Sequence, residues 1–144
     1  MKNSLTVTYL VLAGLLLLTI GSTLILAPHA FHGGNGVVLG DNPNLLSEIR
    51  APGGILVSSA IIILIGAFRA PLRLRAVQLT TLVYGSFGVP RLVSIALDGL
   101  PASSIVAAMA LELAFALIGL VMLWRWKAVS RLAPGRNFAD APAA

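Results

Sequence analysis

The amino-acid sequence predicts an all-α integral membrane protein, a four-helix bundle with both termini in the cytoplasm. Three observations support this fold class. The chain of 144 residues is 58% hydrophobic and only 10% charged, whereas a soluble domain carries about 25% charged residues. Four apolar segments are long enough to cross a hydrocarbon core of roughly 30 Å. Basic residues gather on one side of these segments, and such a bias sets membrane orientation.

The first expected span covers residues 5–27, a nearly unbroken apolar run. A signal peptide is the competing interpretation, because Lys2 precedes the run. The run is longer than the apolar region of roughly 7–15 residues in a signal peptide, and Pro28 directly follows Ala27, the candidate cleavage position. We therefore expect this segment to be retained as a span.

A loop rich in glycine and proline follows, from residue 28 to residue 44. Residues 28–32 are expected to form one helical turn at the membrane interface, since proline suits the first helical position. Asn44 or Ser47 is the expected N-cap of the next helix, which spans the membrane over residues 51–68. This span holds small residues that suit close helix packing in membranes: Gly53, Gly54, Ser58 and Ser59.

The third expected span, residues 76–97, follows a short connection that contains three arginines. Gly85, Gly88 and Pro90 weaken the helix in its second half. Such irregularity is tolerated in a membrane where the segment faces protein or a water-filled cavity. The third span is therefore expected to turn this half toward the bundle.

A tight turn at residues 98–101 precedes the fourth expected span, residues 105–124. Ser103 or Ser104 is the expected N-cap of its helix. Glu112 is the one charged residue within the apolar run of this span.

The two sides of the predicted bundle differ in basic residues. Eight of the ten lysines and arginines fall on the side of the termini: Lys2, Arg69, Arg73, Arg75, Arg125, Lys127, Arg131 and Arg136. Lysine and arginine in short loops favour the cytoplasmic side. We therefore expect residues 1–127 to form a multi-pass domain of the cell inner membrane and residues 128–144 to form a polar cytoplasmic tail.

Isolated ionic side chains within or beside the spans are the main functional signal. A charge in hydrocarbon costs roughly 2.5–3.5 kcal/mol on insertion scales, so it persists only with a partner, a backbone contact or water. Arg91 lies seven residues below Asp98, or roughly 10 Å, at a depth comparable to that of Glu112. The predicted polar cluster lies in the outer half of the bundle: Glu48, Arg50, Tyr84, Arg91, Ser94, Asp98 and Glu112.

Three interpretations of this polar cluster stay open. An ion-pair network of Glu48, Arg91 and Glu112 could only fix the helix packing, or the cluster could form a polar pocket open to the outer face. Binding of lipid headgroups at Arg50 and Asp98 is the third. The cluster contains two cations and three carboxylates, so one carboxylate is in surplus, and Glu112, the deepest, is the expected one.

Other kinds of site find little support in the sequence. Cysteine is absent, which excludes disulfides and thiolate metal sites. His29 and His32, even with Asp41, would make a weak metal site without a further close ligand, so no metal or cofactor is expected. The serines lack a positioned histidine base, and no catalytic residue is assigned. The basic residues flank apolar segments without sharing a face with aromatic side chains, which argues against nucleic acid.

Three short segments resemble the landmarks of a known family: Glu48-Ile49-Arg50 with Gly53 and Gly54, Arg91 to Gly99, and Leu111-Glu112-Leu113. They are similar to a bacterial four-helix membrane family described only as a domain of unknown function and akin to the broader DoxX-like group. The resemblance covers residues 5–123 and implies four helices and an uncharacterised role. Pro90 departs from the small residue expected before the arginine. Some DoxX-like relatives are similar to small subunits of quinone-linked oxidoreductases.

The sequence thus predicts a non-enzymatic accessory or binding subunit. Its polar cluster would be structural or would bind a lipid or a quinone, and its partner would be a membrane protein or a second copy. The alternatives are a membrane enzyme with Glu112 or Glu48 as acid or base on a lipid-like substrate, and a small proton-coupled transporter. The enzyme requires a cavity that touches those carboxylates, so a cavity would favour it and a dry, filled cluster would favour the accessory role.

Overall fold

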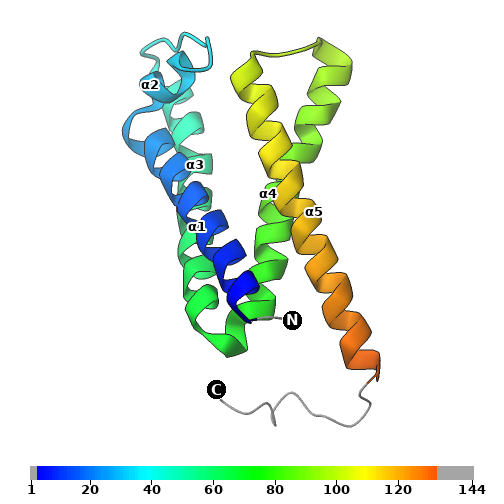
Figure 1. Ribbon diagram of the computed structural model, residues 1–144. Helices are drawn as coiled ribbons and strands as arrows, with labels where there is room; N and C mark the ends of the chain where they lie inside the picture. Colours follow the sequence, from blue (N-terminus) through cyan, green and yellow to red (C-terminus); the bar gives the residue numbers. More distant parts are fainter. Residues whose placement is uncertain (1–2, 133–144) are drawn as a thin grey trace.

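The computed structural model describes the backbone of residues 3–132 and the side chains of residues 4–128. Every secondary-structure element in this part of the chain is a helix (Figure 1). Four of its helices are long and apolar enough to cross a membrane, which confirms the predicted all-α class. The elements are α1 (Asn3–Leu26), α2 (Pro28–Gly33), α3 (Pro43–Phe68), the 3-10 helix η1 (Ala70–Leu72), α4 (Arg73–Asp98) and α5 (Ser103–Leu132).

The four long helices form two antiparallel pairs, α1 with α3 and α4 with α5. α4 meets α1 and α3 at the end of the bundle where α1 begins and η1 joins α3 to α4, which we call the terminal end, whereas the last turns of α5 diverge there. The two pairs diverge toward the opposite end, which carries α2 and the turn between α4 and α5 and which we call the loop end (Figure 1). The bundle is therefore closed in one half and open in the other.

Glycine allows α1 and α3 to approach closely. A Cβ atom on Gly21 would lie 2.8 Å from the carbonyl oxygen of Gly53, and one on Gly53 would lie 2.9 Å from the carbonyl oxygen of Gly21. Gly53 and Ser59 are buried in this contact as expected. Gly54 and Ser58 lie on another face of the helix: no atom lies within 4 Å of a Cβ built on Gly54, and Ser58 is exposed. Because of helical periodicity, only two of the four predicted small residues are buried, and the other two lie on a different face.

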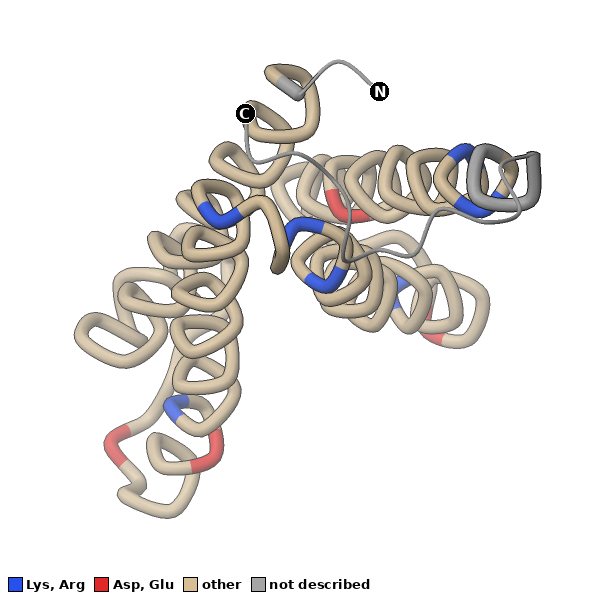
Figure 2. Tube along the Cα trace, turned by 90° about the horizontal axis from the view of Figure 1, so that it is seen from below, with Lys and Arg blue, Asp and Glu red and all other residues tan. Residues whose placement is uncertain are grey.

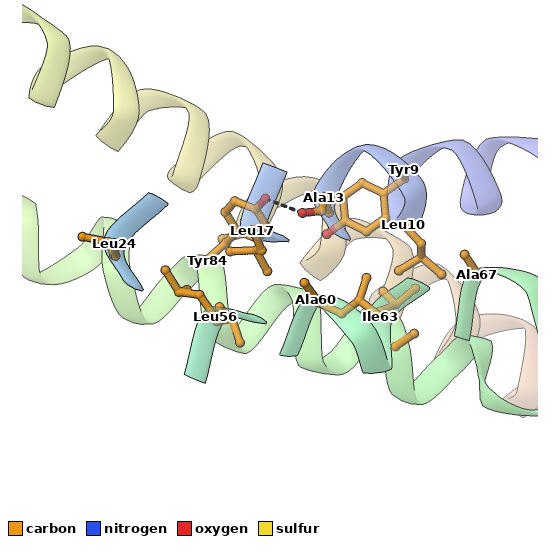
Figure 3. Packing of buried hydrophobic residues seen from close by; sticks show 14 residues of the cluster. Tyr9, Leu10, Ala13, Leu17, Leu24, Leu56, Ala60, Ile63, Ala67 and Tyr84 are labelled. Atoms are coloured by element: carbon orange, nitrogen blue, oxygen red, sulfur yellow. Dashed lines mark hydrogen bonds between the residues drawn. The ribbon is translucent and has the colours of Figure 1, made fainter. Parts of the chain in front are cut away.

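Two tyrosines join the helix pairs near the middle of the bundle. The Tyr84 hydroxyl on α4 donates a hydrogen bond of 2.9 Å to the carbonyl oxygen of Ala13 on α1 (Figure 3). The Tyr9 hydroxyl on α1 donates one of 2.8 Å to the carbonyl oxygen of Phe115 on α5. The rings of Tyr84 and Phe115 stack with 4.7 Å between centroids. Below them, toward the terminal end, Leu10, Ile63 and Val77 are fully buried.

The four long helices all begin before their expected spans, and the N-caps of α3 and α5 differ from the predicted ones. α3 starts at Pro43, and the side chain of Asn42 accepts a hydrogen bond of 2.9 Å from the backbone N–H of Asn44. The prediction of Asn44 or Ser47 as the N-cap is therefore wrong, because proline occupies the first helical position and leaves the cap to the residue before it. The carbonyl oxygen of Ala102 accepts the first bonds of α5, so the cap position also precedes the predicted serines.

The ends of the bundle carry opposite charges among the described residues (Figure 2, viewed from the terminal end). Arg69, Arg73, Arg75, Arg125 and Lys127 lie on η1, its flanks and the last turns of α5. The acidic side chains belong to the loop-end half: Asp41, Glu48, Asp98 and Glu112. The predicted tail begins inside α5, which runs to Leu132, and residues 133–144 lie outside the described part of the chain.

Candidate cavity between the helix pairs

A cavity of about 570 Å³ lies between the two helix pairs in the loop-end half of the bundle. All five α-helices contribute to its lining, and most of the lining residues are apolar. They include Leu16, Ile20, Leu24, Leu56, Phe87 and Leu111. The volume falls within the range of roughly 300–1,000 Å³ that is typical of small-molecule sites, which are largely apolar with a few convergent polar groups.

Tyr84 forms the floor of this cavity. Its side chain is 1% exposed, it lines the cavity, and its ring stacks on Phe115. Ser104 lines the opposite end, near the start of α5. Phe115 follows Ser104 by eleven positions on α5, which corresponds to roughly 16 Å of helix. The cavity is therefore a well that is about as deep as one leaflet of the hydrocarbon core.

An ion pair stands in the wall of the cavity between α4 and α5. Arg91 Nε donates a hydrogen bond of 2.9 Å to Glu112 Oε2, and the two side chains are 35% and 14% exposed. Both residues line the cavity, at the comparable depth that the sequence predicts. Charge-assisted bonds of this kind are among the stronger hydrogen bonds in proteins.

Gly88 allows α4 and α5 to come close enough for this ion pair. A Cβ atom on Gly88, one turn before Arg91, would lie 2.9 Å from Leu113 Cδ2 and 3.3 Å from Glu112 Cβ. A larger residue would push α5 away and lengthen the distance between the guanidinium and the carboxylate. The glycine that the sequence marks as a weak point of the helix thus has a packing role.

Glu48 and His32 lie at the mouth of the cavity with Ser104. Glu48 is exposed near the start of α3, and no ion pair joins it to any residue that the structure describes. The predicted network of Glu48, Arg91 and Glu112 is thus reduced to its last two members. Glu112, the predicted surplus carboxylate, is the one that Arg91 reaches across the α4–α5 contact.

Three members of the predicted polar cluster lie outside the cavity. Arg50 Nε donates to the carbonyl oxygen of Ile25 at 3.1 Å, and Ser94 Oγ donates to Asp98 Oδ2 at 3.0 Å on the exposed last turns of α4. The spacing does place Ser94 and Asp98 near the face of Arg91, but α4 diverges here from the α1–α3 pair. Glu48, Tyr84, Arg91 and Glu112 are the members that line the cavity.

His32 is a polar lining residue that sequence reasoning did not place at the site. The expected helical turn exists as α2, with Pro28 buried, and it places Phe31 and His32 over the mouth of the cavity. His29 instead has its Nε2 atom 3.3 Å from Asp41 Oδ1. The two histidines thus have different neighbours. Within residues 4–128, no three side chains of His, Cys, Asp or Glu form a group suited to a metal ion.

The family described as "Domain of unknown function (DUF4345)" matches residues 5–123 of the chain. The chain belongs to this family. The match runs through all four long helices and includes every residue of the cavity, and it confirms the domain-of-unknown-function part of the resemblance. No curated protein and no solved structure matches the chain. The DUF4345 description states no activity, so the function is argued from the cavity itself.

Proposed function

We propose that this DUF4345 protein is a small integral membrane protein that binds one amphipathic molecule, a lipid or a quinone, between its two helix pairs. The observation that carries the proposal is the cavity of about 570 Å³, which has apolar walls on every helix and the Arg91–Glu112 ion pair at one side. Leucine and phenylalanine side chains suit a hydrocarbon chain or ring. The ion pair and Glu48 at the mouth supply the few polar groups of the lining.

The position of the cavity supports a ligand that comes from the membrane. It lies where the helix pairs diverge, within the stretch of helix that is apolar enough to span the bilayer. An apolar site of this size suits a hydrocarbon chain, which the bilayer supplies. The accessory role predicted from the sequence then becomes a binding role, with the polar cluster in part structural and in part facing the ligand.

The membrane enzyme remains a second candidate, because the cavity touches both carboxylates that such an enzyme would need. Glu48 and Glu112 line it, which meets the geometric requirement stated for acid or base catalysis. Against this, Glu112 is engaged with Arg91 at 2.9 Å, and Glu48 stands at the mouth rather than beside the deep apolar walls. Binding without turnover needs neither carboxylate to be free.

The cell inner membrane is the proposed location, with both termini in the cytoplasm. The support is the bias of arginine and lysine toward the terminal end. Because the chain has no cysteine, single cysteines can report the orientation. Val38→Cys in the loop after α2 should react with a membrane-impermeant maleimide added outside the cell membrane, whereas Ala70→Cys in η1 should react only after lysis. The reverse pattern would overturn the orientation.

Extraction in mild detergent followed by mass spectrometry of the bound lipids tests the binding function. We expect one species enriched over the bulk membrane lipids at about one molecule per chain. Ala108→Phe, which adds a ring inside the cavity, should lower this enrichment at least about tenfold, in line with the cost of overfilling a site. Ala110→Phe is the matched control, since Ala110 is exposed on the same helix and should leave the enrichment unchanged.

The same experiment separates binding from catalysis. A bound species that is identical in the native protein and in Glu112→Gln indicates binding alone. A species that differs between them by one chemical step indicates an enzyme. Equal enrichment in Ala108→Phe and Ala110→Phe, or no enrichment in the native protein, would contradict the proposed site.

A further inference from the structure

Resting on the proposed binding function, we infer the class of molecule that the cavity takes: a single-chain amphiphile whose head carries a protonated amine. The head lies against Glu48 at the mouth, and the chain fills the well down to Tyr84. Size, charge and the order of polar and apolar groups along the well each support this assignment independently.

The size of the cavity limits the ligand to one chain. The cavity of about 570 Å³ lies in the range of roughly 300–1,000 Å³ that holds a drug-sized molecule. A two-chain phospholipid is far larger than this. One alkyl or prenyl chain with a compact head fits, and a well of roughly 16 Å between Ser104 and the level of Phe115 accepts such a chain in an extended form.

The charge of the lining favours a cationic head. Arg91 and Glu112 neutralise each other at 2.9 Å, which leaves Glu48 as a carboxylate without a cationic partner among the described residues. Arg50 is two positions away on α3, turned to the carbonyl oxygen of Ile25, and it does not line the cavity. With His32 counted as neutral, the lining has one more carboxylate than cation. An anionic head would be repelled there, and an ammonium group would be attracted.

The order of groups along the well fixes the direction of the ligand. Glu48 lies at the mouth, and Leu56, eight residues further along α3, lies roughly 12 Å deeper. The floor around Tyr84 and Phe87 is aromatic and uncharged. Arg91 and Glu112 stand between these levels as a mutually neutralised pair, which offers an ammonium group no net negative charge. A positive head is therefore stable only at the mouth, where it also remains in contact with water.

A competition experiment tests the head and the chain separately. The native protein, in nanodiscs of phosphatidylcholine, is labelled with a long-chain alkyl amine that carries a photoreactive diazirine on its chain. Dodecylamine, dodecanol and dodecanoate compete for the site, with each concentration corrected for partition into the bilayer. We expect dodecylamine to compete at about tenfold lower concentration than dodecanol, the usual worth of a charge-assisted bond, and dodecanoate to compete least.

Glu48→Gln should abolish the preference for dodecylamine over dodecanol while the label still reaches cavity peptides. Asp98→Asn is the matched control, because Asp98 is an exposed carboxylate at the same end of the bundle but outside the cavity. It should keep the full preference. Loss of the preference in both variants would show that surface potential alone attracts the amine, and would overturn the inference.

Two failures are distinguishable in this design. Labelling of the cavity peptides with equal competition by dodecylamine and dodecanol refutes the amine head and leaves the binding function standing. Labelling that none of the three competitors reduces, or that misses the residues of the cavity, refutes both.

Discussion

The two halves of the bundle use the same four helices in opposite ways. In the terminal-end half, α4 packs on α1 and α3, and α5 crosses α4 near the middle of the bundle, where a Cβ on Gly119 of α5 would meet Thr81 of α4 and Tyr9 of α1. In the loop-end half, contacts persist within each pair but not between the pairs, and the cavity with its ion pair occupies the space. Helices in a membrane associate where their surfaces pack closely, since lipid chains are as apolar as leucine and hydrophobicity alone gives no preference for another helix.

The closed half should be the more sensitive to an added side chain. Gly119→Leu should lower the free energy of unfolding by about 3 kcal/mol, at the upper end for overpacking, because the new side chain must displace Thr81 and Tyr9. Gly54→Leu, where a Cβ meets nothing within 4 Å, should change it little. Unfolding by sodium dodecyl sulfate in mixed micelles measures both. Equal losses would mean that the helices are not closed at Gly119.

The open half should depend most on its ion pair. Breaking a fully buried pair by removing one partner costs about 3–5 kcal/mol, and Arg91 is 35% exposed, so Glu112→Ala should cost about 2 kcal/mol. The double variant Arg91→Met with Glu112→Leu should recover most of this loss, because no charge is left unpaired. A double variant as unstable as Glu112→Ala would contradict this account of the pair.

The boundary between the halves should respond to the loss of one hydrogen bond. Tyr84→Phe keeps the ring stacked on Phe115 and removes the bond of 2.9 Å to the Ala13 carbonyl. The expected loss is about 1 kcal/mol, the net worth of a typical hydrogen bond. Tyr9→Phe, which removes the bond to the Phe115 carbonyl, should cost a similar amount, and the same micelle titration measures both. A loss near zero in Tyr84→Phe would show that the ring alone joins the pairs.

The smallest effect is expected at the exposed end of α4. Ser94→Ala removes the bond of 3.0 Å to Asp98 Oδ2, which lies in contact with solvent or headgroups. The free energy of unfolding should change by less than about 0.5 kcal/mol, as for most surface substitutions, and ligand enrichment should not change. A larger loss would contradict the exposed position of this hydrogen bond and would show that Ser94 and Asp98 stabilise the packing of the helices.

Of the predicted polar cluster, four residues line the cavity and three lie outside it. Residue counting along α4 and α5 places Arg91 and Glu112 at one level, because helical rise is constant, and they pair as a result. It could not exclude Arg50 or Asp98, since their orientation depends on how the helix pairs diverge. Residue counting could not place His32 at the cavity, because the position of α2 over the mouth depends on the tertiary structure.

The sequence by itself determined the helical class, the four apolar helices, the charge bias between the two ends and the depth of each ionic side chain. All of these follow from composition and from the fixed geometry of the helix. Only the tertiary structure decided that the helices pair two by two and leave a cavity. α1 is apolar on nearly every face, so its pattern does not distinguish Leu17, 3% exposed, from Leu15, 50% exposed. In hydrocarbon that choice depends on close packing at particular glycines and tyrosines, which no one-dimensional pattern records.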